Sequence, residues 1–240
     1  MQQTTTGSCA GTKHASLDAR VRRHAIQRSA LGDSADFVVG LLVPINGSAG
    51  IWGPSSIACA QLAQAEINAA GGLLEREMRL RIIDSSDEAL EVGSVTAALM
   101  RSGASDAFGG RHTSQGRQRV LRDVARQIPY VYTPLYEGGE RTPGVFALGE
   151  TPEQQLRPAI EYLADRYRAR RWMFIGNDYV WPRVSHRLAA RYVSDCGGEL
   201  LGDRYLPFGA EDYSELLDEI RGLRPHAILL SLIGQDAVQF

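Results

Sequence analysis

The 240-residue sequence predicts an α/β fold made of two lobes, each built on a parallel sheet. Strand-like and helix-like segments alternate from residue 37 onward, which is the order in which helices join parallel strands. The stretch 37–43 is continuously apolar, as expected of a strand that is covered on both faces. The alternation restarts after residues 145–149. The sequence therefore predicts Rossmann-like lobes at 37–145 and 146–240, preceded by a polar, disordered extension at 1–36.

The first lobe opens with the strand at 37–43 and a loop of small residues at 44–54. Ser55 or Ser56 can cap the helix that follows, and glycines at 71 and 72 can end it in the left-handed conformation. The apolar positions of this helix repeat at helical spacing: Ile57, Ala60, Ala63 and Ile67. The other predicted elements are strands at 78–84, 107–110 and 129–132 and helices at about 88–102 and 114–127.

The second lobe opens with a helix that Thr151 can cap, with Pro152 in its first turn. Its other predicted elements are strands at 172–175, 199–206 and 227–231 and helices at 181–196 and 211–222. An open parallel sheet of about three strands buries little surface for its size. We therefore expect the second lobe to be truncated at its C-terminal side.

Composition and charge exclude several classes of protein. The net charge is −2 and the sequence pI is about 6.2, which argues against a direct nucleic-acid surface. No apolar window of about 18 residues occurs, so no transmembrane segment is predicted. The stretch 1–36 lacks the apolar core of a secretory signal. The sequence as written predicts a cytoplasmic protein, and a periplasmic or extracellular one if the true start lies upstream.

No catalytic or metal-binding motif is present. The cysteines, Cys9, Cys59 and Cys196, stand far apart and match neither a zinc site nor a disulfide framework. Cys59 and Cys196 lie in helical patterns and are expected to be small buried residues. The histidines accompany no nucleophile motif, and His112 is predicted as a hydrogen-bonding wall residue of a cleft. We predict a protein that is not an enzyme and that needs no cofactor.

A ligand of an open α/β sheet lies beyond the carboxyl ends of the strands. Four loops occupy this position, at 46–55, 110–114, 133–137 and 177–179, and the fourth belongs to the second lobe. A cleft between the lobes could therefore be lined from both sides. The glycine-rich loop at 46–50 lacks the lysine of a phosphate-binding loop and could be a plain turn.

The candidate binding residues in these loops each have a structural alternative. Thr113 and Ser114 either cap a helix or offer hydroxyls to a ligand carbonyl. The aromatic residues that end strands either pack in the core or line a largely apolar pocket. The candidate ligand-binding residues are Thr113, Ser114, Tyr132, Thr133, Tyr136 and Tyr179, with Glu137 and Asp178 in supporting positions.

Four stretches resemble a known family. The opening strand and the stretch 65–72, AEINAAGG, resemble the start of type I periplasmic-binding-protein folds. The stretches 132–138, YTPLYEG, and 174–183, FIGNDYVWPR, resemble the branch of urea- and short-chain-amide-binding proteins, which includes the amide sensor that regulates aliphatic amidase expression. The resemblance implies a two-lobed receptor that closes on a small amide or urea. It assigns ligand contacts to the candidate residues above.

Two departures from that branch concern Arg111 and His112, where the amide sensor has an aromatic and an apolar residue. They leave room for a more polar or acidic ligand. The resemblance implies a cytoplasmic ligand sensor that acts on amidase-type gene expression through an RNA-binding antitermination regulator. The alternative is the substrate-binding component of an ABC transporter for urea, short amides or branched-chain amino acids, with a permease as its partner. Homo-oligomerisation is left open.

Overall fold

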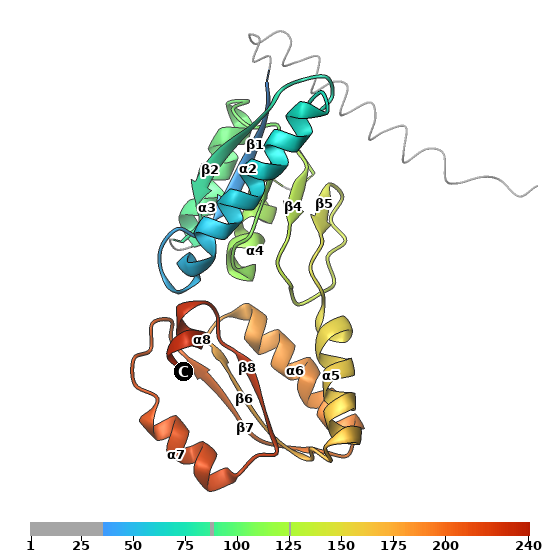
Figure 1. Ribbon diagram of the computed structural model, residues 1–240, viewed down its shortest axis with the longest axis vertical. Helices are drawn as coiled ribbons and strands as arrows, with labels where there is room; N and C mark the ends of the chain where they lie inside the picture. The colour runs from blue at the N-terminus through green and yellow to red at the C-terminus, as the bar shows by residue number, and fades with distance from the viewer. Residues whose placement is uncertain (1–35, 87–88, 125) are drawn as a thin grey trace, which may run out of the picture. The chain divides into compact units, whose positions relative to one another are not determined.

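Two parallel sheets form the framework of Phe37–Phe240 in a computed structural model (Figure 1). The structure describes residues 36–86, 89–124 and 126–240. The first sheet has five strands in the order β2-β1-β3-β4-β5, and the second has three in the order β7-β6-β8. Every described strand pair is parallel, which confirms the predicted α/β class. The predicted extension at 1–36 lies outside the described residues except for Asp36.

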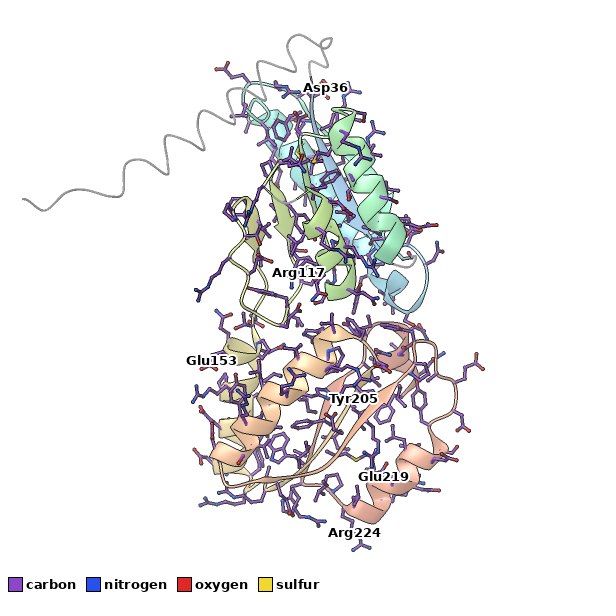
Figure 2. All side chains as sticks on the ribbon, turned by 180° about the vertical axis from the view of Figure 1, so that it is seen from behind. Asp36, Arg117, Glu153, Tyr205, Glu219 and Arg224 are labelled. Atoms are coloured by element: carbon purple, nitrogen blue, oxygen red, sulfur yellow. The ribbon has the colours of Figure 1, made fainter. Side chains whose placement is uncertain are left out.

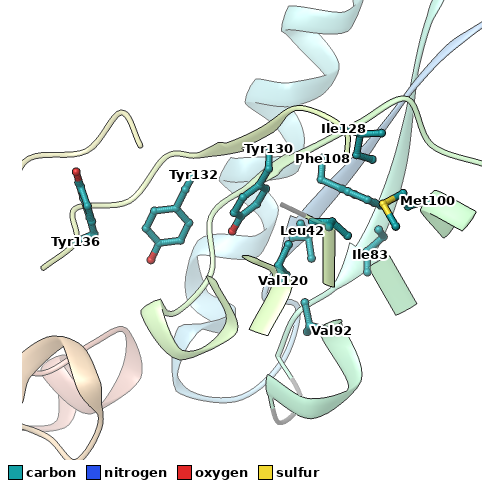
Figure 3. Close-up of a cluster of buried hydrophobic side chains, with 11 residues drawn as sticks. Leu42, Ile83, Val92, Met100, Phe108, Val120, Ile128, Tyr130, Tyr132 and Tyr136 are labelled. Atoms are coloured by element: carbon teal, nitrogen blue, oxygen red, sulfur yellow. The ribbon is translucent and has the colours of Figure 1, made fainter. Parts of the chain in front are cut away.

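The first sheet is built from short strands around a buried centre. Its strands are β1 (Phe37–Val43), β2 (Met78–Asp84), β3 (Ala107–Gly110), β4 (Tyr130–Tyr132) and β5 (Val145–Ala147). The helical elements are η1 (Ser48–Trp52), α2 (Gly53–Ala69), α3 (Ala89–Arg101) and α4 (Ser114–Val124). The hydrophobic core of this sheet contains Leu42 and Phe108 from the strands, and Val92 and Val120 from α3 and α4 (Figure 3).

β5 pairs with β4 and therefore belongs to the first sheet. The predicted border between residues 145 and 146 runs through this strand, because the alternation of strands and helices was expected to restart near residues 145–149. The first sheet in fact extends to Ala147.

The second sheet has a central strand that is buried along most of its length. Its strands are β6 (Arg171–Asn177), β7 (Glu199–Leu206) and β8 (Ala227–Ser231), and its helices are α5 (Pro152–Arg166), α6 (Val180–Asp195), α7 (Ser214–Leu223) and α8 (Gln235–Gln239). Successive side chains of β6 point to opposite faces. Trp172 and Phe174 accordingly pack in one core cluster, and Met173 and Ile175 pack in another.

Two local predictions are wrong. Helix α2 begins at Gly53, and Ser55 Oγ bonds back to the carbonyl of Trp52 instead of capping the helix. Cys59 is exposed, because it lies away from the half-buried face of α2 that carries Ile57 and Ala60. The predicted start of α5 is confirmed, since the Thr151 N–H donates to Gln154 Oε1 at 2.9 Å.

Candidate functional site

Two cavities open where the strands of both sheets end, and both are lined by each lobe. The first, of about 570 Å³, lies between one face of α4 and the start of α6, where Asp178, Tyr179 and Val180 line it. The second, of about 650 Å³, is lined by the loops after β1 and β2, by the start of α4, and by Phe208, Gly209 and Ile233. Gln115 and Arg119 line both cavities.

Thr113, Tyr179 and Asp178 are the candidate residues that line these cavities. Thr113 Oγ1 accepts the N–H of Gly116 at 3.3 Å, so it caps α4 while its hydroxyl hydrogen stays available to the second cavity. Both of the alternatives weighed for Thr113 are therefore compatible with this geometry. Asp178 forms an ion pair with Arg183 at 2.6 Å.

Tyr179 precedes α6 and is buried beside other aromatic rings. Its ring centre is 5.3 Å from that of Phe208 and 6.2 Å from that of Trp181. Burial raises the pKa of Tyr179 well above its usual value, and the nearby Tyr132 and Glu137 act in the same direction. The phenol is therefore neutral and able to donate or accept a hydrogen bond.

Ser114, Tyr132 and Tyr136 lie beneath the cavities, in the core of the first lobe. Figure 3 shows Tyr132 and Tyr136 continuing the row of aromatic side chains that begins with Tyr130. The Tyr132 hydroxyl donates to the carbonyl of His112 at 2.8 Å, and burial raises its pKa to about 12. These three residues are among the buried ones and line neither cavity.

Thr133 is exposed and lines neither cavity. Its hydroxyl donates to the carbonyl of Gly110 at 3.0 Å, which ties the end of β4 to the end of β3. The structure thus brings Thr113 and Tyr179 to the cavities, places Ser114, Tyr132 and Tyr136 behind them, and leaves Thr133 outside.

Glu137 is held by a buried arginine that the sequence reading missed. Figure 2 labels Arg117 in the first lobe. Its Nη2 lies 2.6 Å from Glu137 and its Nη1 lies 2.7 Å from Glu140, and all three side chains are at most 9% exposed. The guanidinium also lies 5.4 Å from the ring centre of Tyr132 and 5.3 Å from that of Tyr136. The arrangement fixes the aromatic strand end to α4.

Glu140 stays ionised in this cluster. Burial alone would raise its pKa, but hydrogen bonds from Thr142 and the charge of Arg117 together lower it. One guanidinium therefore faces two carboxylates. Glu137 Oε2 and Arg117 Nε are buried without a hydrogen-bond partner among the described residues.

His112 is a core residue and not a wall of the cleft, so that prediction is wrong. Its Nε2 lies 2.8 Å from the Tyr130 hydroxyl, and the residue is 5% exposed. Burial lowers the pKa of His112 to about 4, with Arg117 acting in the same direction against a hydrogen bond at Thr113. The ring is therefore neutral at physiological pH. Turning His112 inward leaves its neighbour Arg111 exposed, with its guanidinium 4.3 Å from the ring centre of Trp52.

Asp236 joins the two lobes at the side of the second cavity. It is 1% exposed and accepts hydrogen bonds from Ser48 Oγ of the first lobe at 2.6 Å and from Asn177 Nδ2 at 2.6 Å. The N–H of Gly209 also points to this carboxylate at 3.2 Å. A Cβ on Gly234 would come within 1.8 Å of the Ser48 carbonyl oxygen, so a side chain here would push the lobes apart.

His186 forms a buried polar chain in the second lobe. Its Nδ1 lies 2.7 Å from Asp203 Oδ1, and its Nε2 lies 3.0 Å from Ser231 Oγ. The order of these groups is that of a hydrolytic triad. His186 is fully buried and Ser231 is 3% exposed, and neither lines either cavity. The chain of hydrogen bonds acts as a structural connection between α6, β7 and β8.

The lining residues of α4 were missed, although their spacing carries a recognisable pattern. They recur at the intervals that place side chains on one helical face. The set is Gln115, Gln118, Arg119 and Arg122. A polar helix face beside a predicted ligand loop can indicate a binding site. The sequence alone does not distinguish such a face from an ordinary solvent-exposed one.

None of the helices in the described ranges combines the length and hydrophobicity needed to cross a bilayer. Within the same ranges, no three or more histidine, cysteine or acidic side chains cluster in a way that could hold a metal ion.

Comparison with solved structures supports the fold over most of the chain. A periplasmic binding protein from Burkholderia mallei is 19% identical, with a TM-score of 0.73 over 86% of this chain and 56% of that one. A solute-binding protein of an ABC transporter from R. palustris, in complex with benzoate, is 18% identical, with a TM-score of 0.74 over 85% and 57%. The isoleucine complex of the branched-chain amino acid transporter substrate-binding protein LivJ from Streptococcus pneumoniae is 20% identical, with a TM-score of 0.68 over 81% and 56%.

The chain thus spans little more than half the length of these solved structures. At this level of identity they show the fold alone. A model of the periplasmic binding protein family matches residues 37–240. The parallel sheets, the cavities at their strand ends and this match agree, and the chain belongs to the periplasmic binding protein family, whose members bind ligands without transforming them.

Proposed function

We propose that this chain forms the ligand-binding region of the substrate-binding component of an ABC transporter. The observation that carries the proposal is the second cavity, which residues of both lobes line at the ends of the strands. Its volume of about 650 Å³ lies within the range of small-molecule sites. The structural relatives that carry benzoate and isoleucine are consistent with this role.

The proposed ligand is a small polar solute that Thr113 contacts in the second cavity. Tyr179, which lines the first cavity, is proposed to reach the same solute past Gln115 and Arg119, the residues that line both cavities. Ser114, Tyr132 and Tyr136 support the site from behind, while Glu137 and Asp178 fix the local charges through their arginine partners. Ligand shifts the open–closed equilibrium only by its differential affinity for the two states. Contacts from both lobes supply that difference, because they form together only in the closed state.

Sensing of a short amide or urea is the second candidate function. Asn46 and Gln115 line the second cavity, and their amide groups both donate and accept hydrogen bonds, as a primary amide requires. In this case the protein would stay in the cytoplasm and control an RNA-binding antitermination regulator. The transporter component would instead act outside the cytoplasm and meet a permease.

Replacing Tyr179 with phenylalanine tests the site. We expect the variant to bind its solute about threefold to tenfold more weakly, because one hydrogen bond contributes about 0.5–1.5 kcal/mol. The ring contacts with Phe208 and Trp181 are kept, so the unfolding midpoint without ligand should hardly change. The measurement is calorimetric titration with isoleucine, benzoate, acetamide, propionamide and urea.

The matched control is Tyr162→Phe, which removes a hydroxyl from an exposed tyrosine on α5. Equal affinities for the Tyr179 variant and the unmodified protein would remove this hydroxyl from the site. If no solute binds either protein, the receptor proposal itself is wrong.

A further inference from the structure

We propose that Arg119 is the residue that recognises an anionic group, a carboxylate in chemical terms, of the solute in the second cavity. This inference rests on the proposed receptor function and adds the chemical class of its ligand. It assigns a specificity-determining role to a residue that neither the sequence motifs nor the family match singles out. The inference is based on the charges and the hydrogen-bonding groups of the residues that line the second cavity.

Among the described residues, Arg119 is the one charged residue that lines the second cavity. The other polar lining groups are neutral hydroxyls and amides, such as those of Ser86, Thr113 and Gln115. Arg119 also lines the first cavity, so it stands where the two meet. A single cation in an otherwise neutral, partly apolar enclosure attracts an anion more strongly than it would at an open surface.

The guanidinium of Arg119 is available for a ligand. Among the described residues no carboxylate lies within the 4.0 Å of an ion pair with Arg119. Arg117, two positions earlier on the same helix, is by contrast held by Glu137 and Glu140. The nearby Arg111 is placed over the Trp52 ring. Arg119 can therefore offer the two parallel N–H groups that match a carboxylate.

Ser85 supplies a second, independent indication. The residue lines the second cavity, and its Oγ is buried and has no hydrogen-bond partner among the residues that the structure describes. A buried hydroxyl without a partner costs free energy unless a ligand or water satisfies it. The hydroxyl hydrogen of Thr113 is likewise free to point into the cavity. Arg119, Ser85 and Thr113 thus form a set of donors.

Two described carboxylates that bond to lining residues of the second cavity are already satisfied by the protein. Asp84 accepts hydrogen bonds from the Ile45 N–H at 3.1 Å and the Ser86 N–H at 2.9 Å, and these contacts with others lower its pKa against the effect of burial. Asp236 is engaged by Ser48 and Asn177. Neither carboxylate lines the cavity, so the part of its wall that the structure describes presents hydrogen-bond donors and one positive charge.

Pairs of ligands that share a shape and differ in charge provide the test. Benzoate is compared with benzamide, and propionate with propionamide, by calorimetric titration of the chain at pH 7. We expect each acid to bind at least about tenfold more tightly than its amide, since a hydrogen bond to a charged group contributes about 1.5–3 kcal/mol. Added salt should weaken binding of the acids and leave the amides unchanged.

Arg119→Gln should abolish the preference for the acids, and Arg119→Lys should retain part of it. The matched control is Arg101→Gln, which removes the same charge from an exposed arginine in the last turn of α3 that lines neither cavity. This control should keep the preference. Circular dichroism of each variant checks that it is folded.

The possible failures are distinguishable. Benzamide or propionamide binding as tightly as its acid would overturn this inference and leave the receptor function standing. Equal losses in the Arg119 and Arg101 variants would overturn it as well, because they would indicate a general charge effect. If no acid or amide binds the unmodified chain, this inference and the receptor function both fail.

Discussion

Replacing Arg117 with methionine is expected to destabilise Phe37–Phe240 by about 3–5 kcal/mol, because it leaves two buried carboxylates without their shared cation. Arg117, Glu137 and Glu140 form this cluster, with side chains that are 5%, 9% and 9% exposed. Methionine keeps much of the side-chain volume and the contact with the tyrosine rings. The measured loss therefore reports the missing charge more than a cavity.

A triple variant separates charge from packing. Arg117→Met combined with Glu137→Gln and Glu140→Gln removes the charges together and should recover a large part of the lost stability. The measurement is the free energy of unfolding in urea. If the triple variant were as unstable as the single one, the loss would come from packing.

The chain offers a matched control on its surface. Arg157 of α5 also pairs with two glutamates, Glu153 and Glu161, but all three side chains are about half exposed. Arg157→Met should therefore change stability far less than Arg117→Met, because exposed pairs are solvated and screened. Equal losses in the two variants would contradict the role assigned to burial.

Stability is expected to fall by about 3 kcal/mol from the burial of His112 alone as the pH drops from 6.5 to 4. Burial lowers the pKa of His112 to about 4, whereas the unfolded chain has the usual histidine value near 6.5. Between pH 6.5 and pH 4, the unfolded chain binds a proton at His112 that the folded protein does not bind, so stability falls as the pH drops. Above pH 6.5 both states are neutral, and His112 contributes no pH dependence.

His112→Gln tests this linkage, because glutamine does not titrate. The variant should lose the His112 share of the acid destabilisation, although it is less stable at pH 7 without the bond to Tyr130. The readout is the free energy of unfolding measured from pH 7 to pH 4. Burial also lowers the pKa of His186, so part of the slope should remain.

An identical slope for His112→Gln and the unmodified protein would show that His112 is not held neutral by the fold.

The architecture was predictable because alternation and hydrophobic runs act over whole segments. The stretch 37–43 is apolar throughout, and the structure places β1 between β2 and β3. Helix caps were also predictable from local sequence, as at Thr151, where α5 begins. The border at β5 was harder, because a three-residue strand shows no periodicity and only its pairing with β4 assigns it to a sheet.

The site was less predictable, because the direction of a side chain at a strand end depends on its partners. Tyr132 and His112 lie at the ends of strands, yet both side chains turn inward. The Tyr132 hydroxyl donates to the His112 carbonyl, and the His112 ring bonds to the Tyr130 hydroxyl. The decisive partner of Glu137 is Arg117, which is twenty positions earlier and resembles any other arginine of a polar helix. Tyr179 could be placed because it starts α6 at the end of the longest buried strand.

The carboxylate of Asp236 has a consequence for energetics. It accepts hydrogen bonds from the end of β6, from the loop after β7 and from the first turn of η1. The protein's own hydrogen bonds therefore stabilise the state in which the lobes are in contact. When the binding-competent state is already well populated, the apparent dissociation constant approaches the intrinsic one. A solute would then need few contacts of its own to be retained, and the receptor could hold a very small molecule.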